Sequence, residues 1–296
     1  MIWYYKVRQF VGNYIFVLPA VALFATFSVY PFFKVFQLSV TQWDGISPTM
    51  LYVGLDNFKD LFMDNPVFWL SMRNAFFVTF LALTAQNLLA LGLALLCDRE
   101  IKGGNIYRVI FYLPPVLSGI VVGLIWNWIY DGNYGLLNHF LNFIGLGELS
   151  RAWLSDSKTA LVAVAIIHMW KGFGWGFVIL LAGLQSIPRE LYEAARVDGA
   201  NSWIVFKNIT APLMIPVFIL VSILTILGTM QIFDIIISTT GGGPGYHTEV
   251  PVTRIVSMMI GSSKFGYACA MGVVFGVILL AISMIQIRVS KMMRQV

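Results

Sequence analysis

Six long apolar segments limit what this chain can fold into. They run approximately over Tyr14–Phe36, Phe68–Cys97, Tyr107–Tyr130, Thr159–Leu184, Leu213–Ser238 and Tyr267–Ile287. Each is long enough to cross a bilayer, which takes about 20 mostly apolar residues. Because lipid satisfies no backbone polar group, such segments are expected to be helices, and the alternating segments of a β-barrel are missing. The sequence therefore predicts an all-α polytopic membrane protein with six transmembrane helices.

The composition of the 296-residue chain agrees with a membrane protein and argues against other classes. Hydrophobic residues make up 58% and charged residues only 11%, so much of the apolar surface must face lipid. The formal net charge of +5 does not indicate nucleic acid, because the basic residues are scattered between the apolar segments. Cys97, Cys269 and the histidines lack metal-ligand spacing, so we expect no metal site and no catalytic centre.

Lysine and arginine residues in the connections predict the orientation of the chain, since cytoplasmic loops carry an excess of them. With the N-terminus inside, the inner side carries Lys6, Arg8, Arg99, Lys102, Arg108, Arg189, Arg196, Lys207, Arg288, Lys291 and Arg294. The outer side carries Lys34, Lys59, Arg73, Arg151, Lys158, Arg254 and Lys264, and its loop Thr41–Asn65 is acidic. Both termini are therefore predicted to be cytoplasmic.

A charged segment lies between the fourth and fifth apolar segments, on the side predicted to be cytoplasmic. It reads Glu193-Ala194-Ala195-Arg196-Val197-Asp198-Gly199 and is followed by Ile209-Thr210-Ala211-Pro212. Gly199 stands where a left-handed cap would end a first helix. Ser202 is a possible N-cap of a second helix, which would stop before Pro212. On this chemistry alone, an ordinary amphipathic loop and a docking site for a partner are both open.

The spacing of this segment resembles a known signature. Glu193-Ala194-Ala195, Gly199, Ile209 and Pro212 match the pattern of the permease subunits of binding-protein-dependent ABC importers, with Ala211 in place of the usual leucine. The flanking sequences Leu181–Pro188 (LAGLQSIP) and Thr240–Gly245 (TGGGPG) are similar to the carbohydrate branch, the maltose-type permeases. The resemblance covers roughly residues 68–287 and implies the type I (MetI-like) importer permease fold.

The resemblance also implies a coupling mechanism and a set of partners. In that family the segment is a coupling helix that docks on a cytoplasmic ATPase dimer, which binds ATP and magnesium, so this chain needs no cofactor of its own. The coupling residues implied here are Glu193, Ala194, Ala195, Asp198, Gly199, Ile209 and Pro212. The other implied partners are a second permease subunit, expected to be a different chain, an extracytoplasmic solute-binding protein, a sugar and the lipids of a bacterial or archaeal inner membrane.

The predicted organisation follows from these features. Residues 1–67 form an N-terminal segment with the first transmembrane helix and an outer loop. Residues 68–290 form the core permease domain, with the coupling loop at residues 187–212.

Polar residues inside the apolar segments are candidates for the substrate path. His168, Lys171 and Trp175 follow at spacings of three and four and so share one helix face. Carried over from the maltose-type permeases, the path would include His168, Lys171, Gly172 and Trp175, with Thr225, Gly228 and Thr229 as weaker candidates. The alternatives are that Lys171 pairs with Asp234 and the tryptophans pack, or that the partner permease holds the sugar.

Two further residues and the nature of the sugar complete these expectations. Contact of Lys171 with substrate would favour a hydroxyl-rich or acidic saccharide such as a uronate oligomer. Gln86 and Asn87 in the second segment are interpreted as bonding neighbouring helices rather than substrate.

Two other functional classes are weighed against the importer. An ion-driven secondary transporter would usually show internal repeats and intramembrane carboxylates, which are absent or sparse here. A membrane-embedded enzyme would need clustered acids or metal ligands. The glycine-rich stretches Gly172–Gly176 and Thr240–Gly245 are not followed by the Gly-Lys-Ser/Thr of a nucleotide-binding loop, so ATP hydrolysis is expected in a separate subunit.

Overall fold

A computed structural model of the chain describes residues 16–98 and 103–293. The predicted start of the first span at Tyr14 and several predicted inner-side charges lie outside the described residues, namely Lys6, Arg8, Arg99, Lys102 and Arg294. The chain divides into two compact units. The first unit holds residues 1–65 and 255–277, and the second unit holds residues 66–254 and 278–296. The predicted division into an N-terminal segment, residues 1–67, and a core permease domain, residues 68–290, stays a prediction.

The prediction of a helical multi-pass protein is confirmed. Five described helices are long and apolar enough to cross a membrane: Phe16–Ser39, Pro66–Cys97, Ala160–Gln185, Ser202–Met230 and Phe265–Met292. A sixth crossing exists only if the pair Gly104–Val116 and Gly119–Ile129 counts as one span. The orientation of the termini stays a prediction.

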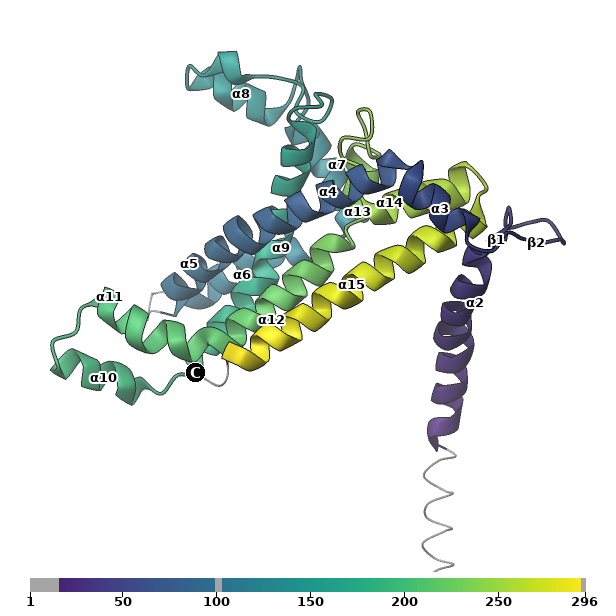
Figure 1. Cartoon of the computed structure of the whole chain (residues 1–296). Coiled ribbons are helices and arrows are strands. Elements are labelled where there is room, and N and C mark those ends of the chain that lie inside the picture. The colour runs from purple at the N-terminus through teal and green to yellow at the C-terminus, as the bar shows by residue number, and fades with distance from the viewer. Residues whose placement is uncertain (1–15, 99–102, 294–296) are drawn as a thin grey trace, which may run out of the picture. The chain divides into compact units, whose positions relative to one another are not determined.

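The second unit is built around one central helix, α9 (Ala160–Gln185). It packs against α5 (Asn87–Cys97), α6 (Gly104–Val116) and α12 (Ala211–Met230), which lie beside it in Figure 1. The core contains Ala90, Phe177, Leu180 and Met214, none of them more than 1% exposed. Small residues let the helices approach closely: a Cβ on Gly174 would come within 2.5 Å of the Phe111 carbonyl oxygen.

The second span contains a local change of helical register. α4 (Pro66–Leu81) continues into α5 through one π-helical turn, η2 (Ala82–Gln86). Such a turn inserts an extra residue into the helix and is often found at functional sites.

Two predicted spans are interrupted. The expected single helix Tyr107–Tyr130 is bent by 97° between α6 and α7 (Gly119–Ile129), directly after Pro114 and Pro115. Proline removes a backbone donor and ends or kinks a helix, so the sequence did contain the signal for this break. The expected helix Leu213–Ser238 ends at Met230, and a separate helix, α13 (Asp234–Thr239), packs against α7.

Two asparagine side chains, Asn138 and Asn74, hold connecting segments of the second unit in place by hydrogen bonds to backbone carbonyls. Asn138 of α8 (Leu136–Phe143) donates to the carbonyls of Gly132 and Arg151 and accepts from the indole of Trp153. The short 3₁₀ turn η3 (Gly147–Leu149) packs against α8. Asn74 of α4 donates to the carbonyls of His247 and Glu249 at 3.0 and 2.9 Å and so holds the glycine-rich loop.

The first unit combines the N-terminal helix with part of the C-terminal one. The helix from Phe16 passes through η1 (Ala25–Val29) and α2 (Tyr30–Ser39), and every residue from Phe16 to Phe33 is exposed, as expected for a lipid-facing span. A small hairpin, β1 (Thr41–Gln42) and β2 (Leu51–Tyr52), pairs Thr41 with Tyr52 and is followed by α3 (Asp56–Met63).

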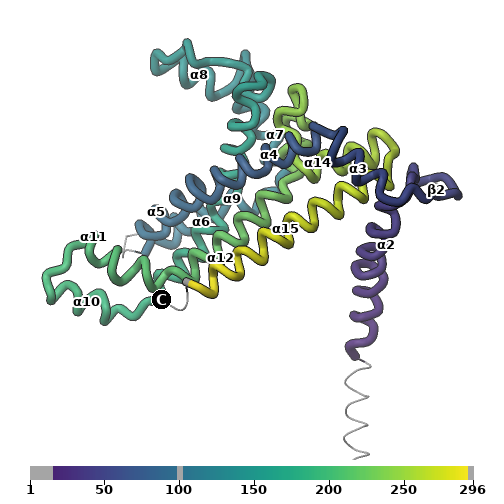
Figure 2. The backbone as a smooth tube through the Cα atoms, viewed as in Figure 1, coloured from purple at the N-terminus to yellow at the C-terminus, as the bar shows by residue number. Residues whose placement is uncertain are grey.

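Segments that are distant in sequence meet in this unit. The path of the backbone through them can be followed in Figure 2. Trp43 contacts Phe265 at the start of α15 (Phe265–Met293), and Asn65 donates to the Tyr267 hydroxyl at 2.7 Å. The helix α14 (Pro251–Val256) and the π-helical turn η5 (Ser257–Gly261) precede α15. In the hairpin loop, hydrogen bonds from Ser47 and from the Ile46 amide lower the pKa of Asp44 to about 2.

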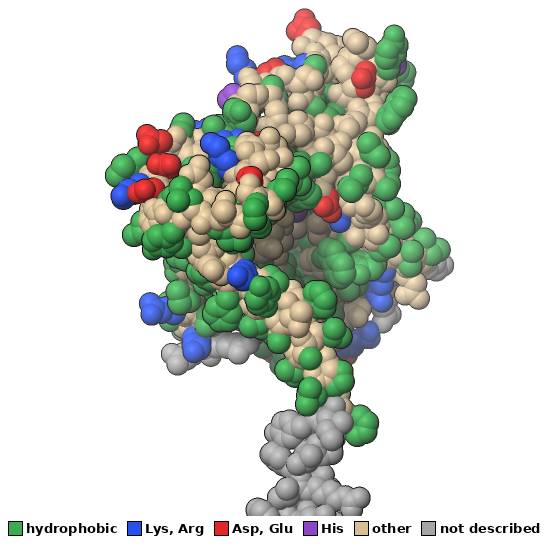
Figure 3. Space-filling model, turned by 90° about the vertical axis from the view of Figure 1, so that its right-hand side faces the viewer, with side chains coloured by type: hydrophobic (Ala, Val, Ile, Leu, Met, Phe, Trp, Pro, Cys, Tyr) green, Lys and Arg blue, Asp and Glu red, His purple; other side chains and the backbone are tan. Residues whose placement is uncertain are grey.

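Many large hydrophobic side chains are exposed on the described residues, as suits contact with lipid. On the face drawn in Figure 3, hydrophobic side chains are spread over the surface and charged side chains stand in scattered small groups.

Candidate functional site

The charged segment forms a well-capped helix. α10 (Arg189–Val197) ends in a pair of backbone bonds, from Gly199 N–H to the Arg196 carbonyl at 3.1 Å and from Ala200 N–H to the Ala195 carbonyl at 2.9 Å. Gly199 has φ +77°, a left-handed conformation that glycine adopts without steric cost. This is a Schellman cap, so the predicted cap at Gly199 is confirmed.

Two details of the predicted second helix are wrong. Its N-cap is Asn201, whose side chain accepts from the Ile204 amide at 2.9 Å, and not Ser202. The helix does not stop before Pro212. It runs from α11 (Ser202–Val205) through the π-helical turn η4 (Phe206–Thr210) into α12, so Ile209 and Pro212 lie within one continuous helix, Ser202–Met230. Pro212 is the second residue of α12, directly after the π turn.

Most residues of this loop are exposed in the part of the chain that the structure describes. α10 contains no buried residue, although Leu191 and Val197 are apolar and Val197 is 88% exposed. Trp203 is 69% exposed. Glu193 and Ala194 are exposed, Ala195 is half-buried and Asp198 is exposed. The hydroxyls of Tyr192 and Thr210, which lie 3.2 Å apart, link α10 to the following helix. Figure 1 shows α10 and α11 as a hairpin projecting from one end of the helices.

A large cavity of about 1450 Å³ separates the loop from the ends of α5 and α6. It is lined by charged residues that include Asp98, Arg108, Arg189 and Glu193. Burial raises the pKa of Asp98, and the nearby Arg189 and Arg108 oppose that rise. Charged residues of the loop and of the ends of α5 and α6 thus line the same cavity.

A second cavity, of about 650 Å³, lies among the helices of the second unit. That volume is typical of a small-molecule pocket. All seven predicted path residues line it: His168, Lys171, Gly172, Trp175, Thr225, Gly228 and Thr229. The structure thus brings together residues of α9 and α12 that are about 60 positions apart in the sequence, as the bond between His168 and Thr229 illustrates. Whether substrate passes along them stays a prediction.

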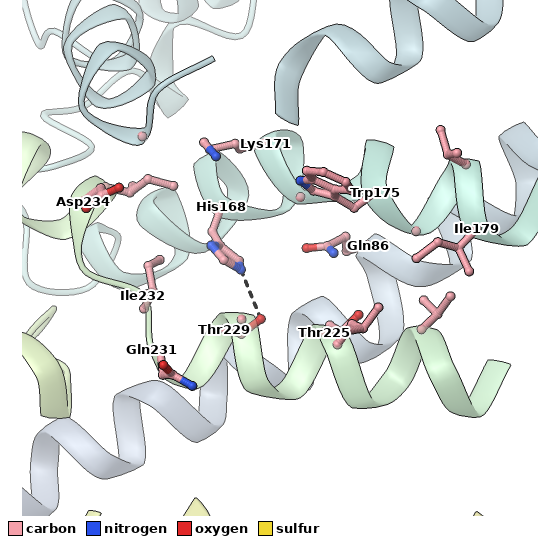
Figure 4. A pocket seen from close by; sticks show the side chains of 18 of the residues that line it. Gln86, His168, Lys171, Trp175, Ile179, Thr225, Thr229, Gln231, Ile232 and Asp234 are labelled. Carbon is pink, nitrogen blue, oxygen red and sulfur yellow. Dashed lines mark hydrogen bonds between the residues drawn. The ribbon is translucent and has the colours of Figure 1, made fainter. Parts of the chain in front are cut away.

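The polar groups of this pocket occupy different positions along it (Figure 4). The His168 ring nitrogen Nε2 and the Thr229 hydroxyl lie 3.1 Å apart and join α9 to α12. The Thr225 hydroxyl donates to the Asn87 amide oxygen at 3.2 Å. Lys171 and Asp234 both line the pocket, but the structure places no carboxylate of a described residue within 4.0 Å of the Lys171 amine. The alternative that Lys171 forms an ion pair with Asp234 is therefore not observed.

The break after α12 contributes directly to the pocket. Gln231, Ile232 and Phe233, which connect α12 to α13, are among its lining residues. Non-helical backbone at membrane depth is tolerated where it lines a cavity or is buried in protein. The break that the sequence analysis did not predict is thus part of the pocket wall.

Gln86, which was predicted to bond neighbouring helices, is a pocket residue. It lines the cavity, is 6% exposed, and its amide oxygen has no hydrogen-bond partner among the described residues. Gly172 of α9 makes room for it: a Cβ there would lie 2.8 Å from the Gln86 amide oxygen. A polar residue within an apolar span is a candidate for function, so the type of residue 86 was a signal. The direction in which the Gln86 side chain points depends on the π-helical turn η2.

Within residues 16–98 and 103–293, no three His, Cys, Asp or Glu side chains come together as a group that could hold a metal ion.

Comparison with known proteins identifies the family. The sequence profile described as "Binding-protein-dependent transport system inner membrane component" matches residues 3–295. The chain is 35% identical to the probable ABC transporter permease protein YurN of Bacillus subtilis, over 94% of this chain and 95% of that one. It is 30% identical to the trehalose/maltose transport system permease protein MalF of Thermococcus litoralis, over 98% and 97% of the two chains.

The fold agrees with this assignment. A chain of a bacterial ABC transporter involved in the import of the acidic polysaccharide alginate superposes with a TM-score of 0.85 at 23% identity, covering 98% of this chain and 99% of that chain. The chain therefore belongs to the family of inner membrane components of binding-protein-dependent transport systems, as a multi-pass permease subunit of such an importer.

Proposed function

We propose that this permease forms the path for a sugar or oligosaccharide that an extracytoplasmic binding protein delivers. The 650 Å³ pocket carries this proposal, because amide, hydroxyl, cationic and aromatic groups converge there inside an otherwise apolar set of helices. Such groups bind hydroxyls and stack on sugar rings. The assignment of trehalose and maltose to the Thermococcus relative supports a saccharide cargo. The partner permease is expected to be a different chain.

We further propose that the loop at residues 187–212 is the coupling surface for a cytoplasmic ATPase dimer. α10 carries Glu193, Ala194 and Ala195 and buries none of its residues within the chain, which suits a helix that docks elsewhere. Glu193 offers a charge-assisted contact, and the alanines allow close approach. ATP and magnesium would be bound by the ATPase, and this chain would have no catalytic role. The proposal requires the loop and both termini to be cytoplasmic.

The first experiment asks whether the partners exist. The full-length chain, affinity-tagged and purified in detergent from its own cells, should bring down a second permease and an ATPase with a nucleotide-binding loop. The complex and its binding protein are then placed in proteoliposomes. Uptake is measured with labelled maltose, trehalose and an oligouronate. Uptake of any of them supports the path. Absence of an ATPase, or uptake of none of the three, would contradict the proposal.

Glu193→Lys tests the coupling surface in the same system. The reversed charge should lower ATP-driven uptake at least about tenfold, because a charge-assisted contact contributes about 1.5–3 kcal/mol. Lys291→Glu, in the exposed last turn of α15 and outside residues 187–212, is the matched charge reversal. Equal uptake by the Glu193→Lys variant and the unmodified protein, with equal ATPase recovery, would remove Glu193 from the coupling surface.

A further inference from the structure

We propose that Gln86 is a specificity-determining residue of the sugar path and binds ring hydroxyls of the substrate at an uncharged subsite. This inference rests on the proposed sugar path. The sequence pattern carried over from the maltose-type permeases places substrate contacts on the fourth and fifth spans, whereas Gln86 comes from the second. In the structure the second span lines the pocket as well, through Gln86.

The burial of Gln86 is the first step of the argument. A buried amide without a hydrogen-bond partner costs free energy, and native proteins rarely leave one. Gln86 is only 6% exposed, it lines the cavity, and its amide oxygen has no hydrogen-bond partner among the described residues. Its neighbour Asn87 differs, because Asn87 is bonded to Thr225. The missing partner of Gln86 is therefore expected in the cavity.

The local backbone explains how Gln86 reaches the cavity. η2 ends at Gln86, so the π-helical turn sets the direction of this residue relative to the regular helix before it. On the opposite side Gly172 leaves the space that the amide occupies. Figure 4 shows Gln86 between Trp175 of α9 and Thr225 of α12. Two independent features, an extra residue in one helix and a glycine in another, thus accommodate one amide.

The chemistry around Gln86 indicates the part of the ligand that it binds. Gln86 and Thr225 offer donors and acceptors without net charge, and Trp175, which is 55% exposed, offers an aromatic ring. Lys171 lies one helical turn before Trp175, toward Asp234. A sugar ring with free hydroxyls fits the subsite of Gln86, Thr225 and Trp175, while any acidic group of the ligand would be placed at Lys171. A site built to hydrogen-bond a hydroxyl discriminates strongly against an analogue that lacks it.

The experiment measures transport by the complete importer with its binding protein saturated, so that the affinity of the binding protein does not enter. Gln86→Leu should lower the uptake rate of labelled maltose, trehalose or oligouronate, whichever the unmodified importer carries, by about threefold to tenfold, the loss of one neutral hydrogen bond. It should also reduce the preference for that sugar over its monodeoxy analogues. Gln86→Asn keeps an amide and should retain more of both.

The matched control is Thr79→Val. Thr79 lies in the same span, and its hydroxyl is likewise buried and without a partner among the described residues, but it does not line the pocket. This variant should transport at the unmodified rate with unmodified preference. If Gln86→Leu and Thr79→Val behave alike, or if Gln86→Leu slows the sugar and its deoxy analogues equally, Gln86 acts only through packing and the inference is wrong.

A second measurement applies even if Gln86→Leu fails to assemble. In a background with Cys97 and Cys269 replaced by alanine, Gln86→Cys should react with a water-soluble thiol reagent, and the transported sugar should slow that reaction. Thr79→Cys should not react. No reaction at position 86, or no protection by a sugar that the importer carries, would overturn the inference. Uptake of none of the three sugars by the unmodified importer would instead contradict the sugar path itself.

Discussion

Gly172 and Gln86 show how one missing Cβ opens a binding position. A methyl group at position 172 would lie 2.8–3.1 Å from the terminal atoms of the Gln86 amide, and this flexible group can move aside without a large change in the helices. Gly172→Ala should therefore reproduce the transport defect of Gln86→Leu, with a rate lowered by about threefold to tenfold. The double variant should be no slower than Gln86→Leu alone, because both changes remove the same interaction.

The control for this residue-scale prediction is Gly92→Ala. Gly92 lies in α5, where an added Cβ would meet no atom within 4 Å, so transport should stay unchanged. Uptake by Gly172→Ala at the unmodified rate, measured beside Gly92→Ala, would show that the amide is not held in place by the glycine.

Much of the candidate site could be predicted residue by residue, and one part could not. His168, Lys171 and Trp175 follow from helical spacing within one span, and the structure finds all three on one pocket. Gln86 is polar and lies inside a span, but its sequence context favoured a bond to a neighbouring helix over contact with substrate. Its orientation depends on a single π-helical turn, and no sequence pattern in Ala82–Gln86 marks that turn.

At the scale of the element, the cap of α10 determines how the coupling loop turns. A residue with a Cβ at Gly199 would pay about 1–2 kcal/mol in the left-handed conformation, whereas asparagine adopts it more readily. Gly199→Val should therefore weaken ATPase recovery and uptake by about fivefold to thirtyfold, and Gly199→Asn should retain most of both. The measurement is the amount of ATPase that co-purifies with the tagged chain, normalised to permease.

Equal loss in Gly199→Val and Gly199→Asn would mean that the side-chain-free surface at position 199 matters and the backbone conformation does not. The cap itself was predictable, because glycine after a charged helical segment is a strong stop signal. The end of the following helix was not, since Pro212 reads as a stop but is accommodated after the π turn η4.

At the scale of the whole molecule, the hydrophobic pattern predicted the class of fold but not its breaks. Five continuous spans follow from length and apolarity alone. The bend of 97° after Val116 and the early end of α12 both occur where α7 and α13 pack together. The bend follows Pro114 and Pro115, which hydropathy does not register. The early end of α12 has no such signal and depends on tertiary contacts, such as the close approach of Gly119 to Asp234. These breaks are also where the pocket is lined by irregular backbone.

Orientation is the property of the whole molecule on which the coupling proposal depends. In the background without Cys97 and Cys269, single cysteines are introduced at two positions that are each 88% exposed, Val197 in the coupling loop and Ile46 in the hairpin loop. A membrane-impermeant maleimide applied to intact cells should label Ile46→Cys, and should label Val197→Cys only after permeabilisation. The excess of lysine and arginine on the predicted inner side is the physical reason. The reverse pattern would place α10 outside the cell, out of reach of a cytoplasmic ATPase, and would overturn the coupling proposal while leaving the family assignment intact.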